Sequence, residues 1–141
     1  VMVYDKQDKQ EVIDKWMKQG GVILASGATT GLDLRGDLAR TNIVAKLLFP
    51  STKSDLTQKR LALPGGKRSY ALSAMRDFIQ ACGRSTRSET DFSITVVLDG
   101  RIARLWRETR EDIPDFIKQA VVWQDVPWAD IREEARKFLN F

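Results

Sequence analysis

Residues 71–101, ALSAMRDFIQACGRSTRSETDFSITVVLDGR, are the stretch from which the rest of the chain is interpreted. A helix-forming run opens the stretch, and an apolar run after it predicts a buried strand. If the helix continues through Gly83, then Gln80, Arg84 and Arg87 stand at i, i+4 and i+7 and share one face. Two guanidiniums can then meet an oxyanion with forked, permanently charged donors, and the Gln80 amide adds neutral hydrogen bonds. Such a group is suited to holding a phosphate while it is transferred.

The spacing of the whole stretch resembles motif VI of the superfamily 2 helicases, in particular the XPD/DinG-like branch. That branch carries A-M-R-x-x-x-Q-A-x-G-R-x-x-R, then an aspartate and a strand that ends in D-x-R. A bare R-x-x-R would mean little, because most such pairs are solvated charges, whereas the full spacing is specific. The residues that fit in order are Ala74, Met75, Arg76, Gln80, Ala81, Gly83, Arg84, Arg87, Asp91, Asp99 and Arg101.

The composition is that of an ordinary globular domain. The chain has 141 residues, of which 43% are hydrophobic and 30% charged, and its net charge of +4 is compatible with nucleic acid or nucleotide phosphate. One cysteine and no histidine exclude an intrachain disulfide and a zinc site of the Cys/His type, and Cys82 is expected to be a small core residue. No bilayer-spanning run or signal peptide is recognisable. We therefore expect a soluble chain, cytoplasmic or, in a eukaryote, nuclear, and the Val-Met-Val start suggests a piece of a longer protein.

The first part of the chain has the order helix then strand. Asp8 can cap a helix that extends to about Lys18, and Gly20 and Gly21 end this helix. The apolar stripe of the helix comprises Val12, Ile13, Trp16 and Met17. Residues 22–25, VILA, are continuously apolar and predict a strand buried on both faces. This rhythm is typical of an α/β fold with a parallel sheet.

Residues 26–36, SGATTGLDLRG, follow that strand, at the edge of an open α/β sheet where ligands bind. Taken alone, an ordinary strand-exit loop is the better interpretation. Beside motif VI, the segment resembles helicase motif V, with Gly31 and Asp33 matching an E-G-x-D core. Thr30 stands where the branch usually has glutamate, so the role of that carboxylate in relatives is in doubt here.

The middle of the chain predicts a strand and then a loop. Residues 41–49 are apolar and end at Pro50, whereas residues 51–68 have no apolar period and are expected to form a mobile basic loop. In helicases of this branch an insertion here lies near the bound strand, so contact with a DNA backbone is one hypothesis and a solvated charge run is the other. The basic residues of this segment are Lys53, Lys59, Arg60, Lys67 and Arg68.

The end of the chain predicts a turn and two helices. Asp99 and Gly100 resemble a tight turn, after which residues 101–106 would fold back as a hairpin; alternatively, Asp99 and Arg101 brace motif VI as an ion pair. Helices are expected after Asp112 and after Asp125, each with a proline in its first turn. Base stacking and core packing are the two roles considered for the tryptophans. Core packing is favoured for Trp16 and Trp128, and the choice between the two roles is left open for Trp106 and Trp123.

The resemblance implies that residues 1–141 form the second, C-terminal RecA-like domain of an ATP-dependent DNA helicase. Such a domain is α/β and three-layered, with a mainly parallel central sheet and helices on both faces. ATP and Mg²⁺ bind mainly to a separate N-terminal RecA-like domain, and the second domain supplies arginine fingers. By resemblance, the catalytic residues are Arg84, Arg87 and Gln80; the nucleotide-binding residues are Gly31, Asp33 and Gly83; and the residues that meet single-stranded DNA are Thr29, Thr30, Lys53, Lys59 and Arg60.

Several parts of a complete motor are missing from the sequence. It has no Walker A motif, no acidic box and no cysteine quartet, so we expect no metal site here and no ATP hydrolysis by this chain alone. An iron–sulfur cluster, which many relatives carry, would belong to the other half of the protein. Two alternatives remain: a non-catalytic RecA-like module that binds nucleic acid or docks a protein, and an unrelated phosphate-binding α/β enzyme. The second of these is disfavoured because the chain lacks histidine and a nucleophile motif.

Overall fold

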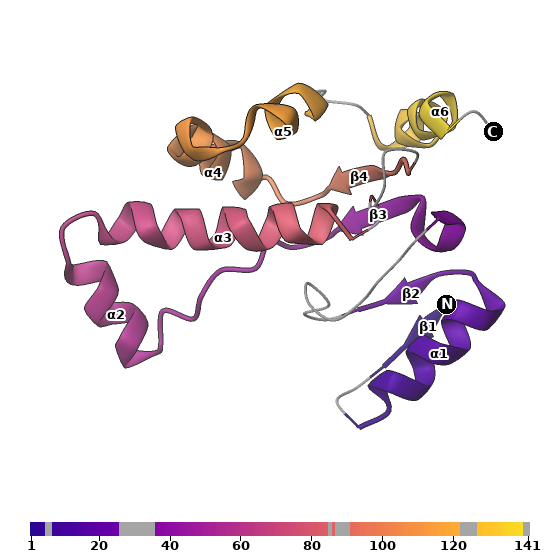
Figure 1. Ribbon diagram of the computed structural model, residues 1–141, viewed down its shortest axis with the longest axis horizontal. Helices are drawn as coiled ribbons and strands as arrows, with labels where there is room; N and C mark the ends of the chain where they lie inside the picture. Colours follow the sequence, from indigo (N-terminus) through magenta and orange to yellow (C-terminus); the bar gives the residue numbers. More distant parts are fainter. Residues whose placement is uncertain (5–6, 26–35, 85, 87–90, 122–126, 140–141) are drawn as a thin grey trace.

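The computed structural model describes residues 1–4, 7–25, 36–84, 86, 91–121 and 127–139 (Figure 1). This part of the chain contains helices, short strands and two short 3₁₀ turns, and helices alone follow the last strand. In chain order the elements are β1 (Met2–Val3), α1 (Lys9–Gln19), β2 (Ile23–Leu24), a 3₁₀ turn (Gly36–Ala39), β3 (Thr41–Val44), α2 (Asp55–Ala62), α3 (Gly66–Cys82), β4 (Ile94–Val97), α4 (Arg101–Thr109), a 3₁₀ turn (Arg110–Asp112), α5 (Asp115–Ala120) and α6 (Trp128–Leu139).

The strands form two parallel pairs. β1 pairs with β2, with Met2 opposite Ile23, and β3 pairs with β4, with Thr41 opposite Ile94. The chain crosses from β1 to β2 through α1, and from β3 to β4 through α2 and α3, which is how parallel neighbours are connected. The α/β class with parallel strands is therefore confirmed, although the sheet seen in the described residues is small.

Helix α1 lies against the first strand pair. Gly20 ends it with a φ of 68°, and the Gly20 N–H donates to the Trp16 carbonyl oxygen at 2.7 Å. Ile13 and Trp16 are buried against a small cluster that includes Met2 and Ile23, and the Trp16 indole donates to the Gly21 carbonyl oxygen. The helix, its glycine stop and the core position of Trp16 are confirmed.

The prediction that residues 22–25 are buried on both faces is wrong. Val22 and Leu24 are 58% and 56% exposed. Ile23, between them, points to the cluster under α1, so the described elements cover one face of this strand. Met17, which we expected in the apolar stripe of α1, is likewise exposed.

The main core lies between α3, α4, the start of α5 and the β3–β4 pair. Trp106 is 8% exposed and packs in this core, so it is no stacking platform. Trp123 and the side chain of Trp128 lie outside the described residues. In α3 the buried face is centred on Ala71, Ala74 and Met75, whereas Leu72, Ile79 and Cys82 are half-buried. The buried residues are Leu47, Ala71, Ala74, Met75, Leu105, Trp106 and Ile113.

The hairpin predicted after Asp99 is wrong, because α4 begins there. The Asp99 carboxylate accepts the backbone N–H of Arg101 at 3.0 Å, and its carbonyl oxygen accepts the N–H of Ile102. An aspartate that satisfies the first N–H groups of a helix is a typical helix start. The two closing helices are confirmed as α5 and α6, with Pro114 and Pro127 just before them.

The loop predicted at residues 51–68 is wrong as well. This segment contains α2 and the first turn of α3, which together form a helical hairpin at the left end of Figure 1. The strand before it is also shorter than predicted, because β3 ends at Val44 and residues 45–50 continue without regular structure.

No helix among the described residues combines the length and the apolar character needed to cross a membrane.

Candidate functional site

The candidate site begins at the carboxyl end of α3, where the helix stops earlier than we expected. Cys82 is its last residue, and Gly83 follows with φ −70° and ψ −1°. The Gly83 N–H donates to the Ile79 carbonyl oxygen, four residues earlier, at 2.9 Å. The Arg84 N–H instead donates to the Ala81 carbonyl oxygen, three residues earlier, at 3.3 Å, so the α-helical hydrogen-bond pattern has changed to that of a tighter turn. The expectation of a helix through Gly83 is wrong, and the physical reason is the poor helix propensity of glycine at a helix end.

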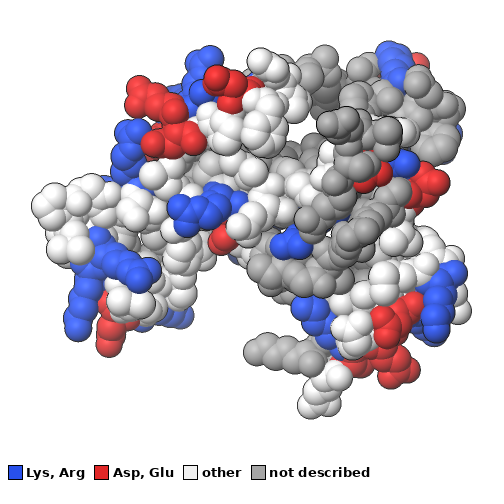
Figure 2. Space-filling model, viewed as in Figure 1, with Lys and Arg blue, Asp and Glu red and all other residues white. Residues whose placement is uncertain are grey.

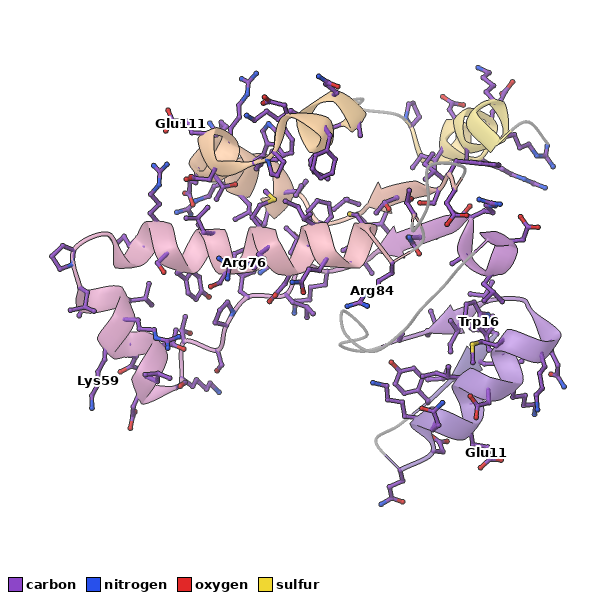
Figure 3. The ribbon with its side chains drawn as sticks, in the orientation of Figure 1. Glu11, Trp16, Lys59, Arg76, Arg84 and Glu111 are labelled. Carbon is purple, nitrogen blue, oxygen red and sulfur yellow. The ribbon has the colours of Figure 1, made fainter. Side chains whose placement is uncertain are left out.

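Gln80 and Arg84, two of the predicted phosphate-binding residues, therefore do not lie on one continuous helix. Gln80 is exposed in the last turn of α3, and Arg84 is half-exposed in the turn beyond it. Figure 3 shows Arg84 leaving the end of α3 on the side opposite α4 in this view. Arg84 also makes an interaction within the chain. Arg87 lies outside the described residues.

Gly83 has no backbone reason within the described fold to be glycine. Its φ is negative, and an added Cβ would lie 3.4 Å from the Ile79 carbonyl oxygen, which is an ordinary contact distance. A side chain at this position would instead project toward whatever approaches the end of α3 from outside. Close approach of a ligand is one general reason for glycine at such a position.

The residues predicted at motif V cannot be placed. Thr29, Thr30, Gly31 and Asp33 lie outside the described residues, which resume at the 3₁₀ turn Gly36–Ala39.

Arg40, which follows that turn, is a residue that the sequence analysis missed. Its guanidinium donates to the Phe92 carbonyl oxygen at 2.8 Å and to the Asp37 carboxylate at 2.9 Å, and its side chain is 18% exposed. It also lies 4.1 Å from the centre of the Phe92 ring, and its carbonyl oxygen accepts the N–H of Ile94. Since residue 40 follows the motif V segment and residue 92 follows the motif VI segment, Arg40 ties the two together. The i, i+3 spacing of Asp37 and Arg40 was the available signal.

The end of α3 is also held to β4 through Cys82. Burial raises the pKa of the Cys82 thiol, and a hydrogen bond with the Thr95 side chain in β4 opposes that rise. Cys82 is half-buried, and it packs as a small apolar residue.

Asp99 and Arg101 form an ion pair, but it braces the segment after β3 rather than motif VI. Asp99 accepts the Leu47 N–H at 2.9 Å, and Arg101 donates to the Leu47 carbonyl oxygen at 3.1 Å. The Arg101 guanidinium donates to the Asp99 carboxylate and, with the Leu47 and Arg101 backbone N–H groups, holds the pKa of Asp99 well below its usual range. Arg101 also lies 4.8 Å from the ring centre of Phe49, which stacks on Tyr70.

The basic residues predicted to contact nucleic acid gather at the other end of α3. Lys59 and Arg60 lie on α2, and Lys53 precedes it; all three are exposed. Basic side chains dominate the surface of this hairpin in Figure 2, and Lys59 points away from the body of the molecule in Figure 3. Because α3 has 17 residues, it separates this cluster from Arg84 by about 25 Å. The structure thus separates two groups that the sequence analysis had not placed relative to one another.

Within the described ranges, no group of three or more histidine, cysteine, aspartate or glutamate side chains could hold a metal ion.

Comparison with known proteins agrees with this arrangement. Residues 1–120 match the family described as the helicase C-terminal domain. The chain is also similar to a probable ATP-dependent helicase of Methanocaldococcus jannaschii, at 25% identity over 114 residues. That match covers 70% of this chain but 18% of the length of the archaeal protein.

Proposed function

This chain belongs to the helicase C-terminal domain family, and from that premise we propose that it is the second RecA-like domain of a two-domain, ATP-dependent DNA helicase of superfamily 2. We place it in the XPD/DinG-like branch. The observation that carries the proposal is the A-M-R-x-x-x-Q-A-x-G-R-x-x-R spacing of the sequence, whose residues up to Arg84 lie on α3 and the turn after it, beside two parallel strands. Parallel strands joined by helices are compatible with a RecA-like sheet.

In this proposal ATP and Mg²⁺ are held mainly by a separate N-terminal RecA-like domain. Arg84 and Arg87 reach across the cleft between the domains and stabilise the negative charge that develops on the γ-phosphoryl group. Gln80 positions the same phosphate through its amide. The exposure of Gln80 and the partial exposure of Arg84 support this assignment, because a ligand from outside the chain can reach both.

The remaining nucleotide-binding residues act through the backbone. Gly83 allows a close approach of the nucleotide, since the described fold leaves room for a side chain that glycine does not fill. Gly31 and Asp33, with Thr29 and Thr30 beside them in the sequence, couple the nucleotide to single-stranded DNA. Arg40 supports that coupling, because it joins the segment that follows motif V to the segment that follows motif VI.

Single-stranded DNA is the proposed second partner of the domain. Lys53, Lys59 and Arg60 are exposed cations at one end of the molecule, which suits a phosphate backbone. The same exposed cations would equally serve a non-catalytic nucleic-acid-binding module, and this is the alternative function. The two differ at the Arg84 end of α3, which a binding module does not need.

The decisive experiment measures DNA-stimulated ATP hydrolysis by the whole two-domain protein. We expect Arg84→Ala and Arg87→Ala each to lower kcat by about a thousandfold or more, with little change in nucleotide affinity. Arg107→Ala, in an exposed position of α4, is the matched control and should leave kcat unchanged. Full activity of both finger variants would refute the motor assignment and leave the binding module.

A further inference from the structure

The α2–α3 hairpin has a defined shape. Gly65 has a φ of 75°, and a Cβ on Gly66 would lie 2.1 Å from the Arg60 carbonyl oxygen, so only glycine lets the two helices approach this closely. The Gly66 N–H donates to Leu63 at 2.9 Å, which closes the turn. The backbone of the hairpin is therefore held in one conformation, and the residues on its outer face have fixed positions relative to one another.

The outer face of α2 combines leucines with cations. Residues 56, 59 and 60 stand at i, i+3 and i+4 and share one side of α2, and Leu63 at i+7 is the residue that follows the helix. Leu56 and Leu63 are 58% and 62% exposed, whereas Thr57 and Leu61 on the other side are half-buried. We call the set Leu56, Lys59, Arg60 and Leu63 the leucine–cation face.

The two cations of this face are available to a partner. Among the residues that the structure describes, neither Lys59 nor Arg60 has an ion-pair partner. Arg68, on the first turn of α3, differs, because it pairs with Asp112 at 2.8 Å and with Glu111 at 3.4 Å. The charges of Lys59 and Arg60 are thus not compensated by an ion pair within the described residues, and Lys59 points away from the body of the molecule in Figure 3.

We propose that the leucine–cation face binds unstacked nucleotides, with Leu56 and Leu63 packed on exposed bases and with Lys59 and Arg60 on phosphates. Every nucleotide of a strand with exposed bases offers an apolar base surface and an anionic phosphate. The leucine–cation face offers apolar and cationic side chains together, so it complements such a strand. A closed duplex hides its bases, and apolar side chains such as leucine enter nucleic acid where stacking is broken. The proposal rests on the proposed function, since it assumes that the domain works on a DNA strand.

An acidic protein is the competing occupant. To bind this face, an acidic protein would need an apolar groove for the leucines and carboxylates at the spacing of the two cations. A nucleic acid, in contrast, supplies a regular series of anions. Residues 53–67 carry four cations, Lys53, Lys59, Arg60 and Lys67, and one acid, Asp55. That excess favours the regular polyanion.

The position of the face sets what it can do in a motor. It lies at the amino-terminal end of α3, about 25 Å from Arg84 along the helix. Contact there would fall on nucleic acid away from Arg84 and from the proposed nucleotide cleft. The face would therefore hold separated strand rather than take part in hydrolysis.

The test compares two single-stranded oligonucleotides of equal length, one with bases and one abasic, by fluorescence anisotropy with the 141-residue chain. We expect the chain to bind the normal strand about tenfold more tightly than the abasic strand. Leu56→Ser combined with Leu63→Ser should remove that difference and leave the salt dependence unchanged. Lys59→Gln combined with Arg60→Gln should weaken both strands and reduce the salt slope by about 1.4, because each phosphate contact on a single strand contributes about 0.7.

Val3→Ser combined with Leu24→Ser is the matched control, because these residues are 64% and 56% exposed and lie on the β1–β2 pair. It should behave as the wild-type chain does. The proposal is overturned if the wild-type chain binds both strands equally, if the preference survives in the leucine variant, or if polyglutamate displaces the normal strand as well as unlabelled normal strand does. Such results leave the proposed function standing, since the Arg84→Ala measurement of ATP hydrolysis decides that separately.

Discussion

The guanidinium of Arg40 donates a hydrogen bond of 2.8 Å to the carbonyl oxygen of Phe92 and lies 4.1 Å from the centre of the Phe92 ring. The two residues are 52 positions apart in the chain. Arg40 stands at the start of β3 and Phe92 just before β4, so their contact holds together the amino-terminal ends of neighbouring parallel strands. The segments that resemble motifs V and VI lead into these two strands, so the contact lies between the two segments.

We predict that Arg40→Ala lowers the free energy of unfolding by about 2 kcal/mol. The largely buried guanidinium makes hydrogen bonds to Asp37 and Phe92 and a cation–π contact, and the truncation removes all of them. Urea denaturation followed by circular dichroism measures the change. Arg107→Ala, in an exposed position, should stay within about 0.5 kcal/mol of the wild-type chain. Equal values for the two variants would show that the Arg40 contacts contribute nothing.

We predict that the stabilisation from Asp99 is lost in acid. Its pKa in the folded chain lies below the ordinary value of 3.8, so the charged form is the one that folding favours. The contribution is therefore complete above about pH 5 and disappears as the pH falls below 3.8 toward the folded pKa. Asp99→Asn should cost about 2 kcal/mol at pH 7, and the gap from the wild-type chain should narrow below pH 4. Thermal unfolding of the wild-type chain and of Asp99→Asn at a series of pH values measures this difference in stability.

Asp115→Asn is the control for that series. Asp115 is 86% exposed and pairs with Lys118 on the surface, a contact that contributes little to stability. If the gap between the wild-type chain and Asp99→Asn is the same at pH 3 as at pH 7, then the ion pair with Arg101 does not stabilise the fold.

We predict different outcomes for two glycine substitutions, one at the start of α3 and one just after its end. Gly66→Ala forces a methyl group against the Arg60 carbonyl oxygen and should destabilise the chain by about 2 kcal/mol. Gly83→Ala meets only an ordinary contact with Ile79 and should change the stability by less than about 0.5 kcal/mol. Urea denaturation compares the two variants directly. A strongly destabilised Gly83→Ala would mean that the glycine serves the fold, and its assignment to nucleotide binding would lose its support.

We predict slow reaction of Cys82 with thiol reagents. Burial raises the pKa of this thiol, so little thiolate is present at neutral pH, and the half-buried sulfur is poorly reached. Ser51→Cys in a Cys82→Ser background supplies an exposed thiol for comparison. Absorbance with an aromatic disulfide reagent should show a slower reaction for Cys82, and the two rates should converge in concentrated urea. Equal rates in native buffer would contradict the packing of Cys82 against β4.

Local patterns predicted much of the secondary structure. The apolar stripe and the double glycine predicted α1 and its end, the apolar run at residues 92–98 predicted a strand that contains β4, and the two aspartate–proline starts predicted α5 and α6. Each of these signals lies within a few residues of the element that it specifies. The same local patterns failed at Asp99 and at residues 51–68, because a weak apolar period does not distinguish a loop from a helix that packs against a neighbour along one side.

By itself, the sequence determined the family, since the spacing from Ala74 to Arg101 is a property of the linear chain. Only the tertiary structure decided that Arg40 joins the segments leading into β3 and β4 and that the cations of α2 lie about 25 Å from Arg84. The physical reason is that these features depend on contacts between residues distant in the chain. Such contacts form only when the α2–α3 crossover has brought β3 and β4 side by side.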